Sequence, residues 1–229
     1  MGILYIVSTP IGNLQDITLR AIDIIKQTEY IACEDTRKTG FLIKSLSEKF
    51  GSFGDKFLFS VYEENEVKRI PEVLSLLENG KNVALLSDAG TPLISDPGFK
   101  LVRECITKGV KVESIPGPSS VISALVVSGL PSDKFTFVGF LPKKPGHRSS
   151  FLKKLKESLE LVKSTVIMFE SPFRLVKTLG ELRQVFGDRE VVVVRELTKI
   201  HEEVKRGKVS ELETYFQKTK PKGEIIILF

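Results

Sequence analysis

Three loops of small and polar residues could hold a charged ligand, because each follows an apolar run that predicts a buried strand. Residues 8–14 (STPIGNL) follow the first run, residues 34–37 (EDTR) the second, and residues 87–98 (SDAGTPLISDPG) the fourth. Ligands of parallel α/β sheets bind beyond the carboxyl ends of the strands. The small residues of the third loop would let the backbone approach a ligand closely. The sequence therefore marks these three loops as candidates for ligand binding, and the twelve-residue third loop above all.

The sequence lacks the motifs of several common enzyme classes. The chain contains no G-x-x-x-x-G-K-[ST] loop, no G-x-G-x-x-G after a strand and no G-x-S-x-G elbow. This counts against an ATPase, a nicotinamide dehydrogenase and a serine hydrolase. The two histidines, His147 and His201, lie far apart in the sequence, and Cys33 and Cys105 have no metal-ligand spacing. We expect no metal and two buried thiols in a reducing cytoplasm.

The elements that position these loops alternate between strand and helix. Apolar runs at residues 4–7, 30–33, 58–61, 83–86 and 110–115 are separated by helical patterns, which predicts a parallel sheet. Asp16 is a predicted N-cap, and Pro97 is predicted to open the helix over 97–108. Pro116-Gly117-Pro118 suits a rigid connector, although an internal turn is the alternative. We therefore expect two domains, residues 1–115 and 116–229.

The second half has a different order of elements. Strands are predicted at residues 135–138, 165–169, 190–195 and 224–229, and helices at 119–128, 172–186 and 210–216. The 229 residues, 41% of them hydrophobic, suffice to bury two such cores. No apolar run reaches the roughly 18 residues that span a bilayer. Residues 1–7 lack the pattern of an export signal, so we expect a cytoplasmic protein without a membrane partner.

Positive charge is concentrated in residues 143–163. This window contains seven lysines and arginines and only two acidic residues, Glu157 and Glu160. Its net charge of +5 equals that of the whole chain. Basic stripes attract polyanions such as nucleic acid, and a solvated lysine-rich helix face is an equally good interpretation. The phosphate-binding candidates are Arg37, Lys143, Lys144, Arg148 and Arg174. Tyr62 and Phe173 are candidates for stacking on bases.

Seven ordered segments carry a resemblance to a known family. They are TPIGNL (9–14), EDTR (34–37), SDAGTPLISDPG (87–98), PGPSS (116–120), SGLP (128–131), GFLP (139–142) and RELTK (195–199). Together they resemble the ribosomal RNA small subunit methyltransferase I branch of the tetrapyrrole methylase superfamily, from Leu4 to Phe229. The resemblance implies two α/β domains, a mainly parallel N-terminal sheet, a mixed C-terminal sheet and a cofactor cleft between them.

The resemblance also implies function. It indicates an enzyme, usually a homodimer, that uses S-adenosylmethionine to methylate the ribose 2′-hydroxyl of a cytidine in the decoding region of 16S ribosomal RNA, nucleotide 1402 in the usual numbering. Its partner would be the small ribosomal subunit. The cofactor-binding positions that it implies are Pro10, Ser87, Asp88, Ala89, Gly90, Thr91, Ile94, Ser119, Ser120, Phe169, Glu170, Lys222 and Gly223.

The acceptor hydroxyl is a weak acid, so a nearby base would assist its attack. Candidates are Glu34, Asp35, Glu170 and Glu196, with Asp35 and Glu170 favoured. The alternative for each is a helix cap or an ion pair with Arg37 or Arg174. Tyr62, Glu64 and Phe173 stand where this branch often has histidines, so we do not expect a histidine base.

Two other functions remain open from the sequence. One is methylation of a small tetrapyrrole, and the other is RNA binding without catalysis. The tetrapyrrole enzymes typically have Gly-Asp-Pro where this chain has Gly90-Thr91-Pro92. Thr91 and the basic window therefore favour the ribosomal RNA branch, and the intact loop of small residues favours an enzyme.

Overall fold

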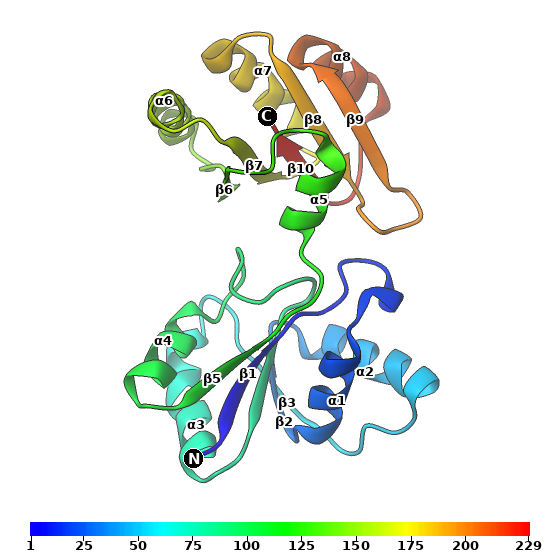
Figure 1. Ribbon diagram of the computed structural model, residues 1–229, viewed down its shortest axis with the longest axis vertical. Coiled ribbons are helices and arrows are strands. Elements are labelled where there is room, and N and C mark those ends of the chain that lie inside the picture. The colour runs from blue at the N-terminus through cyan, green and yellow to red at the C-terminus, as the bar shows by residue number, and fades with distance from the viewer. The chain divides into compact units, whose positions relative to one another are not determined.

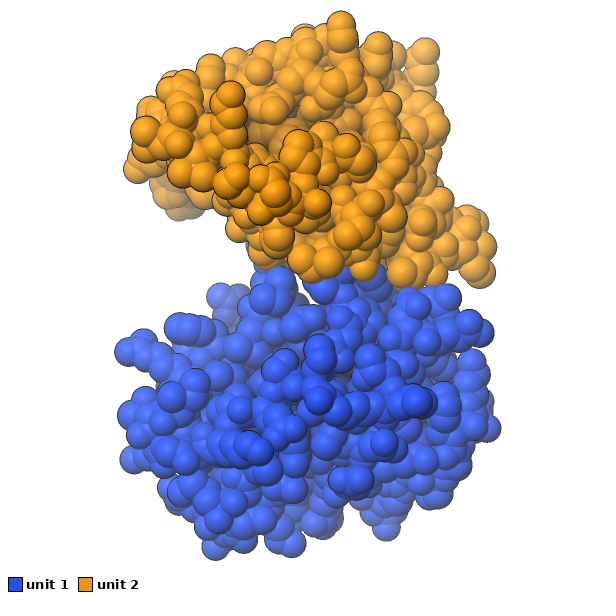
Figure 2. Space-filling view, in the orientation of Figure 1, with its two compact units in different colours: residues 1–119 blue, residues 120–229 orange.

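The computed structural model describes residues 1–229, which divide into two compact units, Met1–Ser119 and Ser120–Phe229 (Figure 2). The predicted division after Ile115 lies just before Pro116-Gly117-Pro118, whereas the structure assigns that segment to the first unit. Each unit contains its own five-stranded sheet. None of the helices combines the length and the hydropathy that a bilayer crossing requires.

The first unit is a parallel sheet with the strand order β3-β2-β4-β1-β5. Its strands are β1 (Ile3–Val7), β2 (Tyr30–Cys33), β3 (Phe57–Ser60), β4 (Val83–Leu86) and β5 (Lys111–Ile115). Its helices are α1 (Leu19–Gln27), α2 (Thr36–Phe50), α3 (Glu66–Glu78) and α4 (Phe99–Thr107), with a short 3₁₀ turn, η1 (Leu14–Asp16).

Helices cover both faces of this sheet, as Figure 1 shows. One core joins α3 and α4 to side chains such as Leu4 and Leu85, and the other joins α1 and α2 to side chains such as Val7 and Ile31. The central strand β4 is buried at every position. Burial on both faces explains why the predicted strands read as continuous apolar runs.

Two predicted helix starts in the first unit are wrong. Thr18, not Asp16, caps α1, because its hydroxyl accepts a hydrogen bond from the backbone N–H of Ala21 (3.1 Å), while Asp16 belongs to η1. Helix α4 begins at Phe99 rather than Pro97, after Gly98 at φ +121°. A Cβ at Gly98 would lie 2.7 Å from the Leu85 side chain, so the entry into α4 requires glycine.

The second unit is a mixed sheet with the strand order β6-β7-β10-β8-β9, in which only β6 and β7 are parallel. Its strands are β6 (Phe135–Phe140), β7 (Thr165–Glu170), β8 (Glu190–Arg195), β9 (Glu203–Lys208) and β10 (Ile225–Leu228). Its helices are α5 (Ser120–Ser128), α6 (Pro145–Leu161), α7 (Leu175–Phe186) and α8 (Val209–Thr219). The expectation of a mixed sheet is confirmed.

One face of this sheet carries the main core. Side chains of α6, α7 and α8 pack there against Val166 and Met168 of β7 and against β8 and β10. Helix α5 packs against β8, β9 and β10. Strand β9 was not predicted, because its sequence EVKRGK offers a single apolar residue and it pairs only with β8. Most of the basic window, residues 143–163, is helix α6, for which the sequence offered only the alternative of a lysine-rich helix face.

Candidate active site

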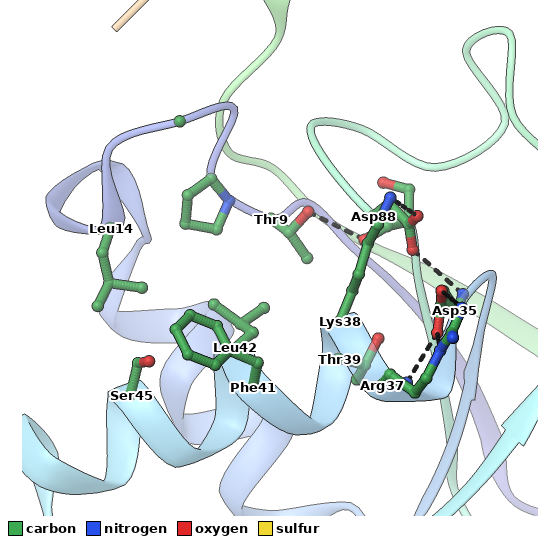
Figure 3. Close-up of a pocket in the computed structure, with 13 residues that line it drawn as sticks. Thr9, Leu14, Asp35, Arg37, Lys38, Thr39, Phe41, Leu42, Ser45 and Asp88 are labelled. Carbon is green, nitrogen blue, oxygen red and sulfur yellow. Dashed lines mark hydrogen bonds and ion pairs between the residues drawn. The ribbon is translucent and has the colours of Figure 1, made fainter. Parts of the chain in front are cut away.

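The three predicted loops begin side by side in the first unit, because β4 lies between β2 and β1 in a parallel sheet. They border a cavity of about 660 Å³ at the carboxyl ends of these strands (Figure 3). Its lining residues are Thr9, Pro10, Gly12, Leu14, Asp35, Arg37, Lys38, Thr39, Phe41, Leu42, Ser45, Ser87 and Asp88. The structure thus brings predicted cofactor, base and phosphate-binding residues together in one cavity. The helix α2 wall, from Lys38 to Ser45, was not predicted.

The first and third loops are joined by a pair of backbone hydrogen bonds. The Thr9 N–H donates to the Gly90 carbonyl (2.9 Å), and the Gly90 N–H donates to the Thr9 carbonyl (3.1 Å). The Thr9 hydroxyl also donates to the Ser87 carbonyl (3.1 Å), and the Ser87 hydroxyl donates to the Gly90 carbonyl (3.0 Å). These four bonds fix the turn that follows β4 beside the cavity.

The Pro116-Gly117-Pro118 segment packs against the same loops. The Thr91 hydroxyl donates to the Pro118 carbonyl (3.1 Å) and accepts from the Ser8 hydroxyl (3.2 Å). A Cβ at Gly117 would lie 2.9 Å from the Ser8 Cβ, so glycine is required for this approach. Thr91, predicted to bind the cofactor, therefore also ties the turn after β4 to the end of the first unit.

Asp35 is both a helix cap and an ion-pair partner. Its Oδ1 accepts from the backbone N–H of Arg37 (2.9 Å), and its Oδ2 lies 2.7 Å from Arg37 Nη2. These hydrogen bonds from Arg37 hold the pKa of the Asp35 carboxyl well below its usual range. The carboxylate is therefore ionised at neutral pH but only weakly basic.

Asp88 links the third loop to the second. Its Oδ1 accepts from the backbone N–H of Asp35 (3.1 Å), and its Oδ2 lies 2.7 Å from Lys38 Nζ, as the dashed lines in Figure 3 indicate. The hydrogen bond to Asp88 raises the pKa of Lys38. Both carboxylates that line the cavity are therefore paired with a cation.

Two neighbouring carboxyls, those of Glu34 and Asp96, have raised pKa values, in contrast to Asp35. Burial, together with Asp88, raises the pKa of Glu34. Burial, with the charges of Glu34 and Asp88, raises the pKa of Asp96 to about 7, although a hydrogen bond with Ser87 opposes the change. Sequence reasoning missed Asp96, because clustering of three carboxyls from two loops is a tertiary effect. The spacing of Asp88 and Asp96 in one loop was the only available signal.

We expect Asp96→Asn to raise the melting temperature at pH 8 and to leave it nearly unchanged at pH 4. The folded-state pKa of this acid lies above its unfolded value, so its ionisation opposes folding increasingly as pH rises from about 4 to 7. Since the side chain is part exposed, solvent screens the effect to about 1–2 kcal/mol, or roughly 2–8 °C. Calorimetry across this range checks it, with the exposed Asp55→Asn as control. A gain that does not grow with pH would refute the assignment.

Predicted residues of the second unit gather at one edge of its sheet. The register pairs Ile225 with both Glu170 and Arg195. Strands β7 and β8 therefore end where β10 begins, which brings Phe169 and Glu170 to the same edge as Lys222 and Gly223. Of the other predicted cofactor positions, Ser120 opens α5, Ser119 precedes it, and Ala89 and Ile94 lie in the loop after β4.

Glu170 lies inside the second unit rather than at its surface. Its side chain is 0% exposed; Oε1 lies 2.7 Å from Arg174 Nη2, and Oε2 accepts from the Thr178 hydroxyl (2.5 Å). Its Oε1 also accepts from the backbone N–H of Ser171 (2.7 Å). Both carboxylate oxygens are engaged in structural bonds. The predicted role of Glu170 as a base does not fit this burial.

Arg148 and Glu196 are likewise engaged. The Arg148 side chain is 3% exposed and forms a bidentate ion pair with Glu181, so its guanidinium cannot reach a phosphate. Glu196 accepts from Lys199 Nζ (2.9 Å) and from the backbone N–H of Glu224 (2.9 Å), and hydrogen bonds such as these lower its pKa against the opposing effect of burial. Lys143 and Lys144, by contrast, are exposed.

Comparisons with known proteins match this architecture. A model of the family described as Tetrapyrrole (Corrin/Porphyrin) Methylases matches residues 3–213. Among solved structures, uroporphyrin-III-C-methyltransferase from Thermus thermophilus is similar with a TM-score of 0.65 at 18% identity, covering 100% of this chain and 94% of that one. The methyltransferase CobJ is similar with a TM-score of 0.70 at 14% identity, covering 100% and 93%. These likenesses show the fold.

Curated relatives are more similar in sequence. A Thermotoga maritima protein named ribosomal RNA small subunit methyltransferase I is 48% identical over 228 residues, covering 100% of this chain and 98% of the relative. Relatives of the same name from Hydrogenobaculum sp. and Streptococcus pyogenes are 44% and 42% identical; the matches cover 98% and 99% of this chain, and 94% and 76% of the relatives. The chain therefore belongs to the tetrapyrrole methylase family, in the branch of ribosomal RNA small subunit methyltransferase I.

Proposed function

We propose that this protein uses S-adenosylmethionine to methylate the ribose 2′-hydroxyl of a cytidine in the decoding region of 16S ribosomal RNA. The observation that carries the proposal is the 48% identity to the Thermotoga maritima relative over nearly the full length of both chains. The seven sequence segments that resemble this branch support the finer part of the proposal, that the acceptor is the ribose of nucleotide 1402. A homodimer acting on the small ribosomal subunit in the cytoplasm belongs to the same proposal.

The residues around the cavity fit a sulfonium donor, which would supply an electrophilic methyl group. A free carboxylate against the sulfonium would stabilise the starting state more than the transition state and would slow transfer. Asp35 and Asp88 are each paired with a cation, and the turn after β4 consists of small residues beside the cavity. Pro10 and residues 87–91 are therefore proposed to hold the donor.

Alignment of the acceptor oxygen is proposed to supply most of the rate enhancement. Good positioning can lower a barrier by about 7–11 kcal/mol. Among the predicted bases only Asp35 lines the cavity, and we propose that it accepts the proton. Its depressed pKa makes it a weak base. We therefore expect it to accelerate methyl transfer by about 10²-fold, the lower end of the range for general base catalysis.

Transfer of label from radioactive S-adenosylmethionine tests the proposal. The acceptors are small ribosomal subunits, free 16S RNA and uroporphyrinogen, each incubated with the full chain. Because 2′-O-methylation blocks alkaline cleavage of the adjacent phosphodiester, label in alkali-resistant dinucleotides supports the proposal. Label in the tetrapyrrole would support small-molecule methylation instead. RNA binding without transfer would support the non-catalytic alternative.

Reversing the charge of Lys143 and Lys144 to glutamate should weaken RNA binding and spare cofactor binding. Both lysines are exposed on the segment before α6, so each can neutralise a phosphate. The slope of log Kd against log salt should fall by about two. Lys81→Glu with Lys108→Glu is a control that changes the net charge equally, and both lysines precede strands at the amino-terminal edge of the first sheet. Equal losses in the two double variants would show a net-charge effect only.

A further inference from the structure

An aromatic cluster lies at the parallel pair of strands in the second unit. The Phe169 ring contacts Phe137 edge-on at 5.0 Å and Phe140 at 5.4 Å between ring centroids. Helix α5 packs against β8, β9 and β10, whereas the cluster lies on β6 and β7 at the other side of the sheet. Phe140 is 58% exposed at the end of β6. The cluster thus presents an aromatic surface to solvent.

A second exposed ring follows the neighbouring strand. Phe173 is 96% exposed in the turn after β7. Because β6 and β7 are parallel neighbours with Phe140 opposite Phe169, both strands end at the same edge. Arg174 Nη1 donates to the Leu141 carbonyl (3.3 Å), which ties the residue after Phe173 to the residue after Phe140.

Buried ion pairs hold this edge in place. The Arg148 guanidinium, paired with Glu181, also donates to the carbonyls of Pro142 (3.3 Å) and Lys143 (3.4 Å). Arg174 is paired with the buried Glu170 while it holds Leu141. Both arginines, first considered as phosphate ligands, thus fix the loop that carries Lys143 and Lys144. A fixed loop loses less conformational entropy when it binds a ligand.

The sequence that surrounds Phe140 carries charge of one sign. From Phe135 to Lys156 the chain contains six basic residues and no acidic residue. Exposed lysines beside exposed aromatic rings are the combination that binds single-stranded nucleic acid, in which bases stack and phosphates pair with cations. A second copy of this chain that docked through the same surface would bring like charges together, so charge complementarity favours RNA.

We propose that Phe140 and Phe173 stack on unpaired bases of the RNA substrate while Lys143 and Lys144 bind the phosphates beside them. The proposal rests on the proposed function and assigns part of its substrate-binding surface. Phe140 and Phe173 are then binding residues for single-stranded RNA, and Arg148 and Arg174 are positioning residues.

Fluorescence anisotropy with the full chain tests the stacking. The probes are a labelled oligocytidylate of about 12 nucleotides and an abasic strand of the same length. Phe140→Ala and Phe173→Ala should each weaken oligocytidylate binding by about 5- to 150-fold and leave abasic binding unchanged. Phe140→Trp, which keeps an aromatic face, should retain affinity. Phe57→Ala is the matched control, because Phe57 is also 58% exposed but begins β3 in the other unit.

Each contrary outcome is distinct. Unchanged oligocytidylate affinity, or an equal loss on the abasic strand, would overturn the stacking proposal, provided that circular dichroism shows folded variants. Dissociation of a dimer by Phe140→Ala in sedimentation, with RNA affinity intact, would assign the surface to a second copy and overturn it as well. Absence of methyl transfer to small subunits by the unmodified protein would instead overturn the proposed function.

Discussion

Gly90→Arg should abolish detectable binding of S-adenosylmethionine. Gly90 lies at φ +88°, bonded through both backbone groups to Thr9, and a Cβ there would lie 3.3 Å from the Ile11 side chain. Arginine would therefore strain the backbone by about 1–3 kcal/mol and push a long cationic side chain into the turn proposed to hold a cationic donor. We expect Kd, measured by titration calorimetry, to rise at least about 100-fold.

Gly51→Arg separates backbone strain from the site. Gly51 follows α2 at φ +81°, close to the φ of Gly90, but a Cβ there meets nothing within 4 Å. Both variants should lose stability from backbone strain, and only Gly90→Arg should lose cofactor affinity. Equal affinities in both variants and the unmodified protein would move the cofactor away from the turn after β4.

Much of the first unit could be predicted from the sequence, because its strands are buried on both faces. A strand such as Val83–Leu86 reads as an apolar run whichever helix covers it. Helix starts were harder, since the cap of α1 depends on which of Asp16 and Thr18 reaches a backbone N–H. Strand β9 could not be predicted, because pairing with β8 and not hydrophobicity makes it a strand.

The position of the candidate site followed from topology, but the roles of its charged residues did not. Residues after β1, β2 and β4 must meet when β4 lies between the other two strands. Whether a carboxylate such as Asp35 is free or paired depends on side-chain geometry that spacing does not reveal. The sequence left the cap and ion-pair alternatives open for Asp35, and the structure contains both interactions.

The burial of two charged residues, Glu170 and Arg148, could have been predicted from the periodicity of the sequence around them. Glu170 lies two residues after Met168 and four after Val166 in β7, so its side chain points to the same face of the strand, which is the core face. Arg148 precedes Leu152 by four residues and so shares the buried face of α6. Periodicity could therefore have separated Arg148 from Lys143 and Lys144, which lie outside the helix.

Glu170→Ala should destabilise the second unit more than any other single change considered. Loss of the carboxylate leaves Arg174 without its partner and the Thr178 hydroxyl without its acceptor. Breaking a buried ion pair by removing one partner costs about 3–5 kcal/mol. Calorimetry should show the melting temperature falling by about 10 °C or more. Thr178→Val, which removes one neutral donor from the same carboxylate, should cost only about 1 kcal/mol.

The isosteric Glu170→Gln variant distinguishes a structural carboxylate from a catalytic one. Glutamine keeps the shape of the side chain but removes the charge that faces Arg174, so a structural role predicts a large loss of stability. A structural role also predicts that kcat falls by less than about tenfold when it is measured on the fraction that remains folded at low temperature. Removal of a general base would lower kcat by about 10²-fold or more. An unchanged melting temperature with a hundredfold lower kcat would instead make Glu170 the base, because a proton acceptor can be lost without loss of the fold.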